Sequence, residues 1–211
     1  MRDRCTEAIR ANFLPRTLRE SAPENRPSRW RRSAFGWRSL LFLGLILSLS
    51  FNVFSQNQPS EYQVKAAFLY NFAKFVEWPP ASFPKPNSPI VIGVLGKNVF
   101  GNALEQVIRN HRVNDHPFQF KTFNSAADAA GHCQILFISS SQKDNFSRII
   151  EELHGASVLT VSENDGFIKA GGMINFVIED NKIRFQISDA AAKKAGLKIS
   201  SKLLTLAVNT R

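Results

Sequence analysis

Three short apolar runs, each rich in β-branched residues, constrain the fold of this chain more than any other feature. They are residues 89–96 (PIVIGVLG), 133–140 (CQILFISS) and 157–162 (SVLTVS). Apolar runs without alternation are typical of strands that helices cover on both faces. Helical patterns over 99–110 and 141–155 separate the runs. Because short strands that alternate with helices pair in parallel through right-handed crossovers, the sequence predicts a three-layer α/β domain.

A later segment, GGMINFVIEDNKIRFQI at 171–187, breaks this rhythm. It reads as two alternating strands with few residues between them, which must pair antiparallel. One face is apolar throughout, and its residues are Ile174, Phe176, Ile178, Ile183, Phe185 and Ile187. Gly171 and Gly172 indicate a turn that needs positive φ or a close approach by another segment. We therefore expect a mixed, mostly parallel sheet with an antiparallel C-terminal hairpin.

Helices are also expected at both ends of the domain. From position 61, apolar residues recur at three- and four-residue steps, and Pro79 and Pro80 are expected to stop this helix. Ser188 or Asp189 is expected to cap a helix that Gly196 ends, and 198–207 is predicted as the last helix.

The N-terminal part resembles an export signal. Arg31, Arg32 and Arg38 precede the apolar run 40–55, and a polar stretch follows. A basic flank, a short apolar core and small residues before the cleavage point predict a secretory signal that is removed after Ser55. We interpret 1–55 as an extension with a signal peptide and 56–211 as one domain. The alternative is an uncleaved membrane anchor, although a spanning helix needs about 20 residues.

The charge distribution argues against nucleic acid as the partner. The net charge is +10, but 1–55 holds 10 Lys+Arg against 4 Asp+Glu, a net of +6. This leaves 17 against 13, a net of +4, for 56–211. A mildly basic domain with interspersed signs lacks the basic footprint of a nucleic-acid-binding protein.

Neither a metal site, a cofactor nor a disulfide is expected. Cys133 is the one thiol of residues 56–211, so an internal disulfide is excluded there. The histidines show no paired ligand spacing; they are His111, His116, His132 and His154.

Two loops that follow predicted strands are candidate ligand sites. Gly96, Lys97 and Asn98 stand between a strand and a helix, where anions can bind, but they form no phosphate-binding motif. Ser139 opens a run of three serines at the end of another strand, yet no nucleophile motif surrounds it. A tight turn and a helix cap are the simpler interpretation of these two loops, and we expect a protein that is not an enzyme.

Partner-binding candidates lie elsewhere. Trp78 stands at a helix end beside two prolines, and aromatic residues are enriched in interfaces. Lys182 and Arg184 lie in the second hairpin strand, which is a candidate docking edge. For both cations, ordinary solvated charge that discourages edge pairing is the competing interpretation.

Four segments, in this order, resemble the YfiR/HmsC-like family of periplasmic regulators: VKAAFLYNFAKFVEWP, IGVLGKNVFG, GGMINFVIEDNKIRFQI and AAAKKAGLKISSKLLTLA. The resemblance spans about 61–207. It implies a Rossmann-like domain without catalytic activity that resides in the periplasm. The resemblance also implies that the protein binds the periplasmic part of an inner-membrane diguanylate cyclase and holds that enzyme inactive. An outer-membrane lipoprotein is the implied partner that releases the cyclase.

The chain departs from the family pattern in having one cysteine where relatives use pairs for redox control. Intramolecular disulfide switching is therefore not expected. A sensor kinase is an alternative target. The sequence leaves open whether the protein forms a homodimer. The alternative function is a small-molecule sensor with a ligand at Gly96 and Ser139.

Overall fold

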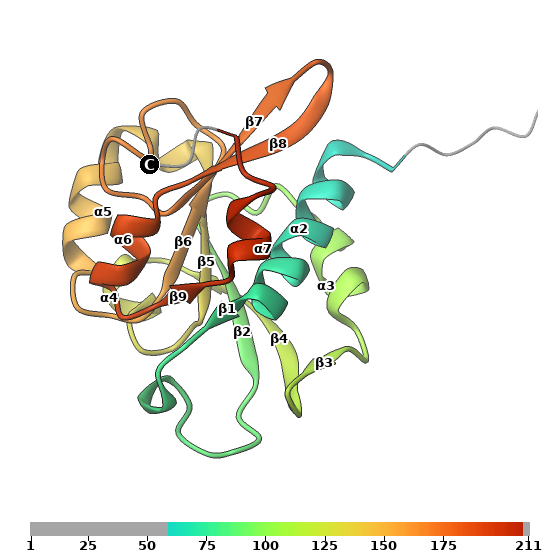
Figure 1. The fold of residues 1–211 in the computed structure, drawn as a ribbon, viewed down its shortest axis with the longest axis vertical. Coiled ribbons are helices and arrows are strands. Elements are labelled where there is room, and N and C mark those ends of the chain that lie inside the picture. Colours follow the sequence, from blue (N-terminus) through green and yellow to red (C-terminus); the bar gives the residue numbers. More distant parts are fainter. Residues whose placement is uncertain (1–58, 209–211) are drawn as a thin grey trace, which may run out of the picture. The chain divides into compact units, whose positions relative to one another are not determined.

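A seven-stranded sheet forms the centre of the fold, with the spatial order β3–β4–β2–β5–β6–β7–β8 (Figure 1). The computed structural model describes residues 59–208, so the predicted signal and its cleavage after Ser55 lie outside the described residues. Strands β4, β2, β5, β6 and β7 pair in parallel, and β3 and β8 pair antiparallel at the two edges. The strands are β2 (Ile90–Leu95), β3 (Arg112–Val113), β4 (His116–Phe123), β5 (Ile135–Ile138), β6 (Leu159–Ser162), β7 (Ile174–Glu179) and β8 (Lys182–Ile187).

Helices pack on both faces of this sheet. One apolar cluster joins the sheet to α2, α3 and α7, and a second joins its other face to α4 and α5. Helix α6 follows β8, and two short 3-10 helices lie at Pro80–Ser82 and Ser140–Asn145. The α-helices are α2 (Glu61–Phe75), α3 (Ala103–Ile108), α4 (Ala126–Ala129), α5 (Phe146–Glu152), α6 (Asp189–Lys194) and α7 (Ser201–Leu204). The predicted α/β fold with a mixed, mostly parallel sheet is confirmed.

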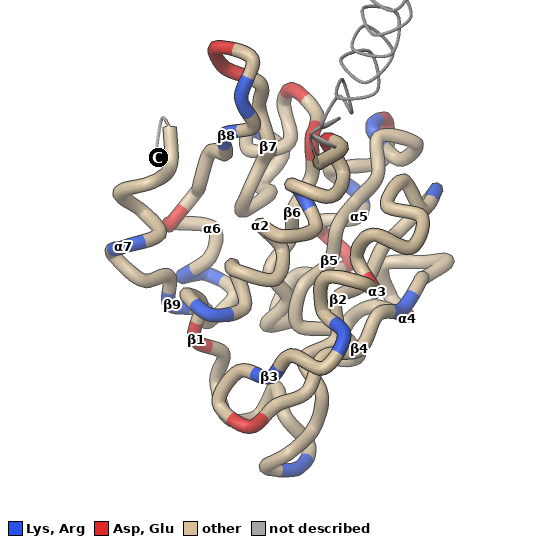
Figure 2. The backbone as a smooth tube through the Cα atoms, turned by 90° about the vertical axis from the view of Figure 1, so that its right-hand side faces the viewer, with Lys and Arg blue, Asp and Glu red and all other residues tan. Residues whose placement is uncertain are grey.

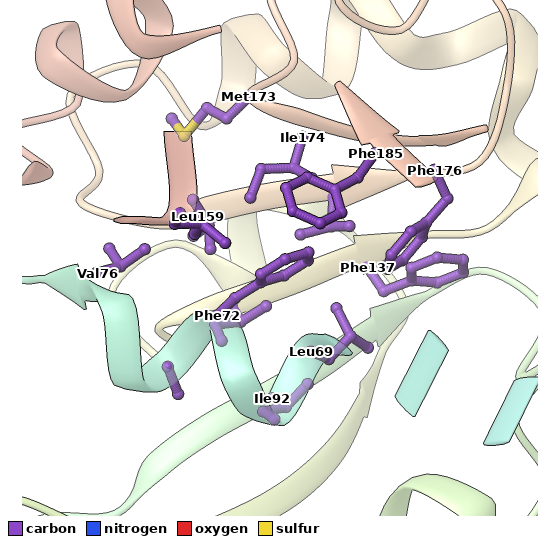
Figure 3. Packing of buried hydrophobic residues seen from close by; sticks show 14 of the residues in the cluster. Leu69, Phe72, Val76, Ile92, Phe137, Leu159, Met173, Ile174, Phe176 and Phe185 are labelled. Carbon is purple, nitrogen blue, oxygen red and sulfur yellow. The ribbon is translucent and has the colours of Figure 1, made fainter. Parts of the chain in front are cut away.

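The three apolar runs are the central strands. Every residue of β2, β5 and β6 is buried, as expected for strands with helices on both sides. On the α2 side, Phe72 packs against Phe176 and Phe185 with ring centroids 5.9 and 5.2 Å apart (Figure 3). The aromatic face of α2 therefore belongs mainly to the core.

The two glycines before β7 have different structural reasons. Gly171 has φ +98°, which side chains of L-residues rarely allow. Gly172 is not in that region, but a Cβ placed there would lie 2.2 Å from Cε1 of Phe167. One glycine thus turns the chain, and the other makes room for a buried aromatic ring.

The main errors of the sequence prediction concern helix ends. Helix α2 stops at Phe75, before the prolines, because Val76–Glu77 forms strand β1 and pairs with Lys198–Ile199, strand β9. Residues 198 and 199 are consequently extended, and α7 is only Ser201–Leu204 rather than 198–207. The helix predicted over 99–110 is shortened to α3.

Charged residues of both signs are interspersed over the described part of the chain (Figure 2). Within residues 59–208, none of the helices combines the length and the apolar character that a bilayer crossing requires.

Candidate functional site

An apolar groove lies between the first turns of α2 and the far end of the β7–β8 hairpin. We call it the hairpin groove; its volume is about 500 Å³, and its lining includes Val64, Phe68, Ile178, Lys182 and Ile183. In Figure 1 the hairpin projects beyond the body of the domain near the start of α2. The groove is therefore a surface feature rather than part of the core.

The hairpin itself explains why apolar groups are exposed there. Asp180 and Asn181 both have positive φ, at 50° and 58°, which permits the tight two-residue turn between β7 and β8. The apolar face continues along the hairpin toward its turn, where the hairpin projects beyond the body of the domain (Figure 1). Ile178 is consequently 66% exposed, and Leu206 is the other large apolar side chain exposed to a similar extent among residues 59–208. Because Ile178 lies in an apolar groove, this surface is a candidate interaction site.

The helical wall of the groove is held by a partly buried ion cluster of Lys65, Glu61 and Glu163. Ser60 and Gln63 form a capping box that starts α2. One turn further on, Nζ of Lys65 lies 2.5 Å from Oε1 of Glu61 and 2.5 Å from Oε2 of Glu163, the residue after β6. Because Glu61 also lines the groove, this cluster ties the groove wall to the sheet.

Electrostatics of the cluster keep Lys65 charged. The residue is only 4% exposed, and burial by itself favours the neutral amine. Hydrogen bonds to Glu163 and Glu61 outweigh this burial and raise the pKa of Lys65. The pKa of Tyr62 is raised as well, first by burial and then by the nearby charge of Glu163, to which its hydroxyl donates.

Of the predicted docking cations, Lys182 lines the groove and Arg184 does not. Arg184 pairs with Val177 in the hairpin and lies on the face opposite to Ile183. The edge of β8 is also partly covered, because the backbone N–H of Val208 donates to the carbonyl of Phe185 at 2.9 Å. Strand addition to this edge is therefore restricted to the part near the hairpin turn.

Trp78 lies far from these cations. Its Nε1–H donates to the carbonyl of Gln134 at 3.2 Å, and Gln134 directly precedes β5. Because β5, β6 and β7 are parallel, this places Trp78 at the amino end of the sheet, whereas the hairpin turn follows the carboxyl end of β7. Trp78 is half-buried against the core. The structure does not bring the three predicted docking residues together.

The candidate ligand loops do meet, at the carboxyl ends of β2 and β5. The backbone N–H of Lys97 donates to Oγ of Ser141 at 3.0 Å. A Cβ at Gly96 would lie 2.5 Å from the same oxygen, so the serine occupies the space beside the glycine. The amide that an anion would need is thus already bonded within the protein.

Asn98 and Ser139 are engaged in the same way. Oδ1 of Asn98 accepts from the N–H of Phe100 at 3.0 Å, and its Nδ2 donates to the carbonyl of Gly101 at 3.3 Å. Ser139 is fully buried, and its Oγ caps the 3-10 helix by accepting from the N–H of Ser141 at 3.5 Å. These contacts favour the interpretation of both loops as a turn and a cap.

The remaining chemistry-bearing side chains are dispersed. Among the described residues, no three of the His, Cys, Asp and Glu side chains converge in a way that could hold a metal ion. Nδ1 of His116 lies 2.6 Å from the carbonyl of Ser88, and Nδ1 of His132 lies 3.0 Å from that of Asp128. Cys133 is 2% exposed, and burial raises the pKa of its thiol to about 12. This thiol is protonated at neutral pH and is not a nucleophile.

Sequence reasoning missed the groove and the ion cluster. Ile178 follows the alternation of a buried strand, and nothing in that alternation indicates that the end of the hairpin projects beyond the body of the domain (Figure 1). Lys65 looks like a solvated helix residue, although Glu61, four positions earlier, is a recognisable ion-pair partner. Glu163 was not identified as its partner because it comes from a distant strand end.

This geometry defines an α/β domain with a capped helix and a projecting hairpin that form an exposed apolar groove. A model of the YfiR/HmsC-like family matches residues 62–208, and the chain belongs to that family. The suggested resemblance is thereby confirmed. Membership is consistent with a periplasmic regulator of cyclic-di-GMP signalling.

Other comparisons are more distant. A conserved domain protein from Vibrio cholerae O1 biovar El Tor has a TM-score of 0.48 at 12% identity, over 72% of this chain and 60% of its own. An ABC domain in complex with L-Trp from Streptococcus pneumonia has a TM-score of 0.44 at 10% identity, over 58% of this chain and 55% of its own. This chain thus spans somewhat over half of each structure. No curated protein matched.

Proposed function

We propose that this protein is a periplasmic, non-enzymatic regulator that binds a membrane-bound signalling enzyme and represses it. The family membership points to a diguanylate cyclase as the target, and a sensor kinase is the alternative. We further propose that the domain uses its Rossmann-like scaffold only to present a docking surface. The observation that carries the proposal is the hairpin groove, where Ile178 is 66% exposed.

Docking alone is sufficient for repression. A protein that binds the inactive state of an enzyme more tightly than the active state shifts the equilibrium between them. A difference of about 1.4 kcal/mol in binding free energy shifts it tenfold. The apolar floor of the groove would supply affinity, and Lys182 and Glu61 at its rim would fix the orientation of the partner.

The substitution Ile178→Asp tests this proposal. The side chain is largely exposed in the free protein, so the substitution is expected to leave folding intact. Burying an isoleucine in an interface contributes about 1.5–3 kcal/mol, and a buried carboxylate is unfavourable. We expect affinity for the purified periplasmic part of the cyclase to fall at least about tenfold, and cellular cyclic-di-GMP to rise.

Leu206→Asp is the matched control. Leu206 is 62% exposed but belongs to the segment after α7 and does not line the groove. Titration calorimetry with the cyclase domain should show near wild-type affinity for this variant. Equal affinities of wild type and Ile178→Asp would refute the groove as the docking site, and absence of binding by the wild type would refute the choice of target.

A further inference from the structure

A second cavity, distinct from the hairpin groove, lies between α5 and α6. Its volume is about 330 Å³, and no residue lines both features. The walls are mainly apolar. They come from Ile150 and Leu153 on the α5 side, Val158 and Met173 directly before β6 and β7, and Ala191 and Ala195 on the α6 side. Small-molecule sites in proteins have about 300–1,000 Å³ and predominantly apolar walls, so this cavity has the size for a small ligand.

Local chain geometry keeps the cavity open. The α6 wall presents alanines, whose short side chains do not fill the space between the helices. On the opposite side, Gly171 lines the cavity, and its φ of +98° disfavours every other residue type. A Cβ at this position would approach Cγ2 of Ile150 to 3.1 Å. The glycine before β7 therefore also leaves room within the cavity wall.

Two basic side chains belong to the lining. They are Lys194, in the last turn of α6, and His154, just after α5, and both are exposed residues. Within residues 59–208, neither side chain makes a hydrogen bond or an ion pair; by contrast, the neighbouring Lys193 is paired with Asp189 at 2.5 Å. An apolar chamber with an unpaired ammonium and an imidazole at its margin matches a ligand with a short hydrocarbon body and one anionic end.

We propose that this cavity binds a small amphiphilic carboxylate, such as a medium-chain fatty acid. The hydrocarbon chain lies between α5 and α6, and the carboxylate accepts hydrogen bonds from Lys194 and His154. At the alternative ligand loops, the backbone N–H of Lys97 and the hydroxyl of Ser139 are bonded within the protein, whereas the side chains of Lys194 and His154 are not. The proposal does not depend on partner docking, because it concerns a different surface.

Octanoate is the test ligand, and the protein purified from the periplasm is the sample. The melting temperature, followed by circular dichroism, should rise by roughly 5 °C or more when octanoate is present at 100 times its dissociation constant. Each methylene transferred to an apolar site contributes about a fourfold gain in affinity, so octanoate should bind roughly 15-fold more tightly than hexanoate. Octylamine, with the opposite charge on the same chain, should bind at least about tenfold more weakly than octanoate, because it cannot accept from Lys194.

Two pairs of variants locate the site. Ala191→Leu fills the cavity and should abolish the octanoate shift, whereas Ala127→Leu, at an exposed position of α4 outside the cavity, should preserve it. Lys194→Gln should weaken octanoate about tenfold, and Lys202→Gln, an exposed lysine on α7 outside the cavity, should not. No shift with octanoate, an equal response to octylamine, or undiminished binding by both Ala191→Leu and Lys194→Gln would each overturn the proposal. Because Lys194→Gln changes a surface side chain, the test holds even where Ala191→Leu is poorly folded.

Discussion

The substitution Gly172→Ala tests the packing that positions the start of the β7–β8 hairpin. A methyl group there would lie 2.2, 2.4 and 2.6 Å from Cε1, Cδ1 and Cζ of Phe167. Gly172 does not have positive φ, so alanine meets no backbone strain and the whole cost is steric. Phe167 is fully buried and packs edge-on against Phe146, with ring centroids 5.0 Å apart. The ring therefore cannot swing away without disturbing the core on the α5 side.

The expected magnitude follows from this geometry. Added methyl groups in a well-packed core destabilise proteins by about 1–3 kcal/mol. Because three atoms of an immobilised ring lie inside contact distance, we expect about 3 kcal/mol for Gly172→Ala. For a domain of this size, each kcal/mol lowers the melting temperature by about 2–4 °C, so the loss should be about 10 °C. Urea unfolding followed by circular dichroism measures the same change in free energy.

A double-mutant cycle separates ring contact from other effects. Phe167→Leu removes the edge of the ring that a Cβ at Gly172 would meet, at its own cost in stability. In that background, Gly172→Ala should cost only about 1 kcal/mol, a coupling of about 2 kcal/mol between the two positions. A cost below about 0.5 kcal/mol in the wild type, or equal costs in both backgrounds, would show that the ring is not the reason for the glycine.

Two further perturbations test the buried polar groups. Lys65→Met leaves the carboxylate of Glu163, whose side chain is 10% exposed, without its cation. We expect this variant to lose about 3 kcal/mol of stability in urea unfolding, and Lys65→Met/Glu163→Leu to regain most of that loss. A double variant that is no more stable than Lys65→Met would refute this reasoning. Cys133 should resist iodoacetamide in the native state at neutral pH, because burial raises its pKa from 9.0 to about 12. Since the unfolded thiol releases its proton first, stability should fall by up to about 1.4 kcal/mol per pH unit between pH 9 and 12, and Cys133→Ala should lose that part of the slope.

The sequence predicted those features of the candidate sites that depend on neighbouring residues, and it missed those that depend on contacts between residues distant in the sequence. The sequence placed Gly96 and Ser139 at strand ends correctly, because strand and turn signals are local. It did not show that Ser141 fills the space between the two loops, since that contact joins residues 44 positions apart. Trp78 looked like a free aromatic anchor, but the carbonyl that accepts its Nε1–H belongs to Gln134, 56 positions away.

The predicted helix boundaries were wrong for the same reason, because contacts between distant segments decide them. Residues 76–77 continue one predicted helix and 198–199 begin another, yet they pair with each other as β1 and β9. A backbone hydrogen bond from Ser200 to the carbonyl of Phe75 closes the end of α2 against this small sheet. The gain from pairing two distant segments outweighs a weak local preference for helix at the ends.

The sequence by itself determined the layer architecture, the buried central strands and the hairpin, because apolar periodicity specifies which face of each element must leave water. The membership of the YfiR/HmsC-like family was also readable from its motifs. Only the tertiary structure decided which apolar side chains were left uncovered: Ile178 is exposed on the projecting part of the β7–β8 hairpin (Figure 1), and a cavity opens where alanines of α6 face α5. Such sites arise from how far two elements overlap, and this overlap depends on contacts between segments that are distant in the chain.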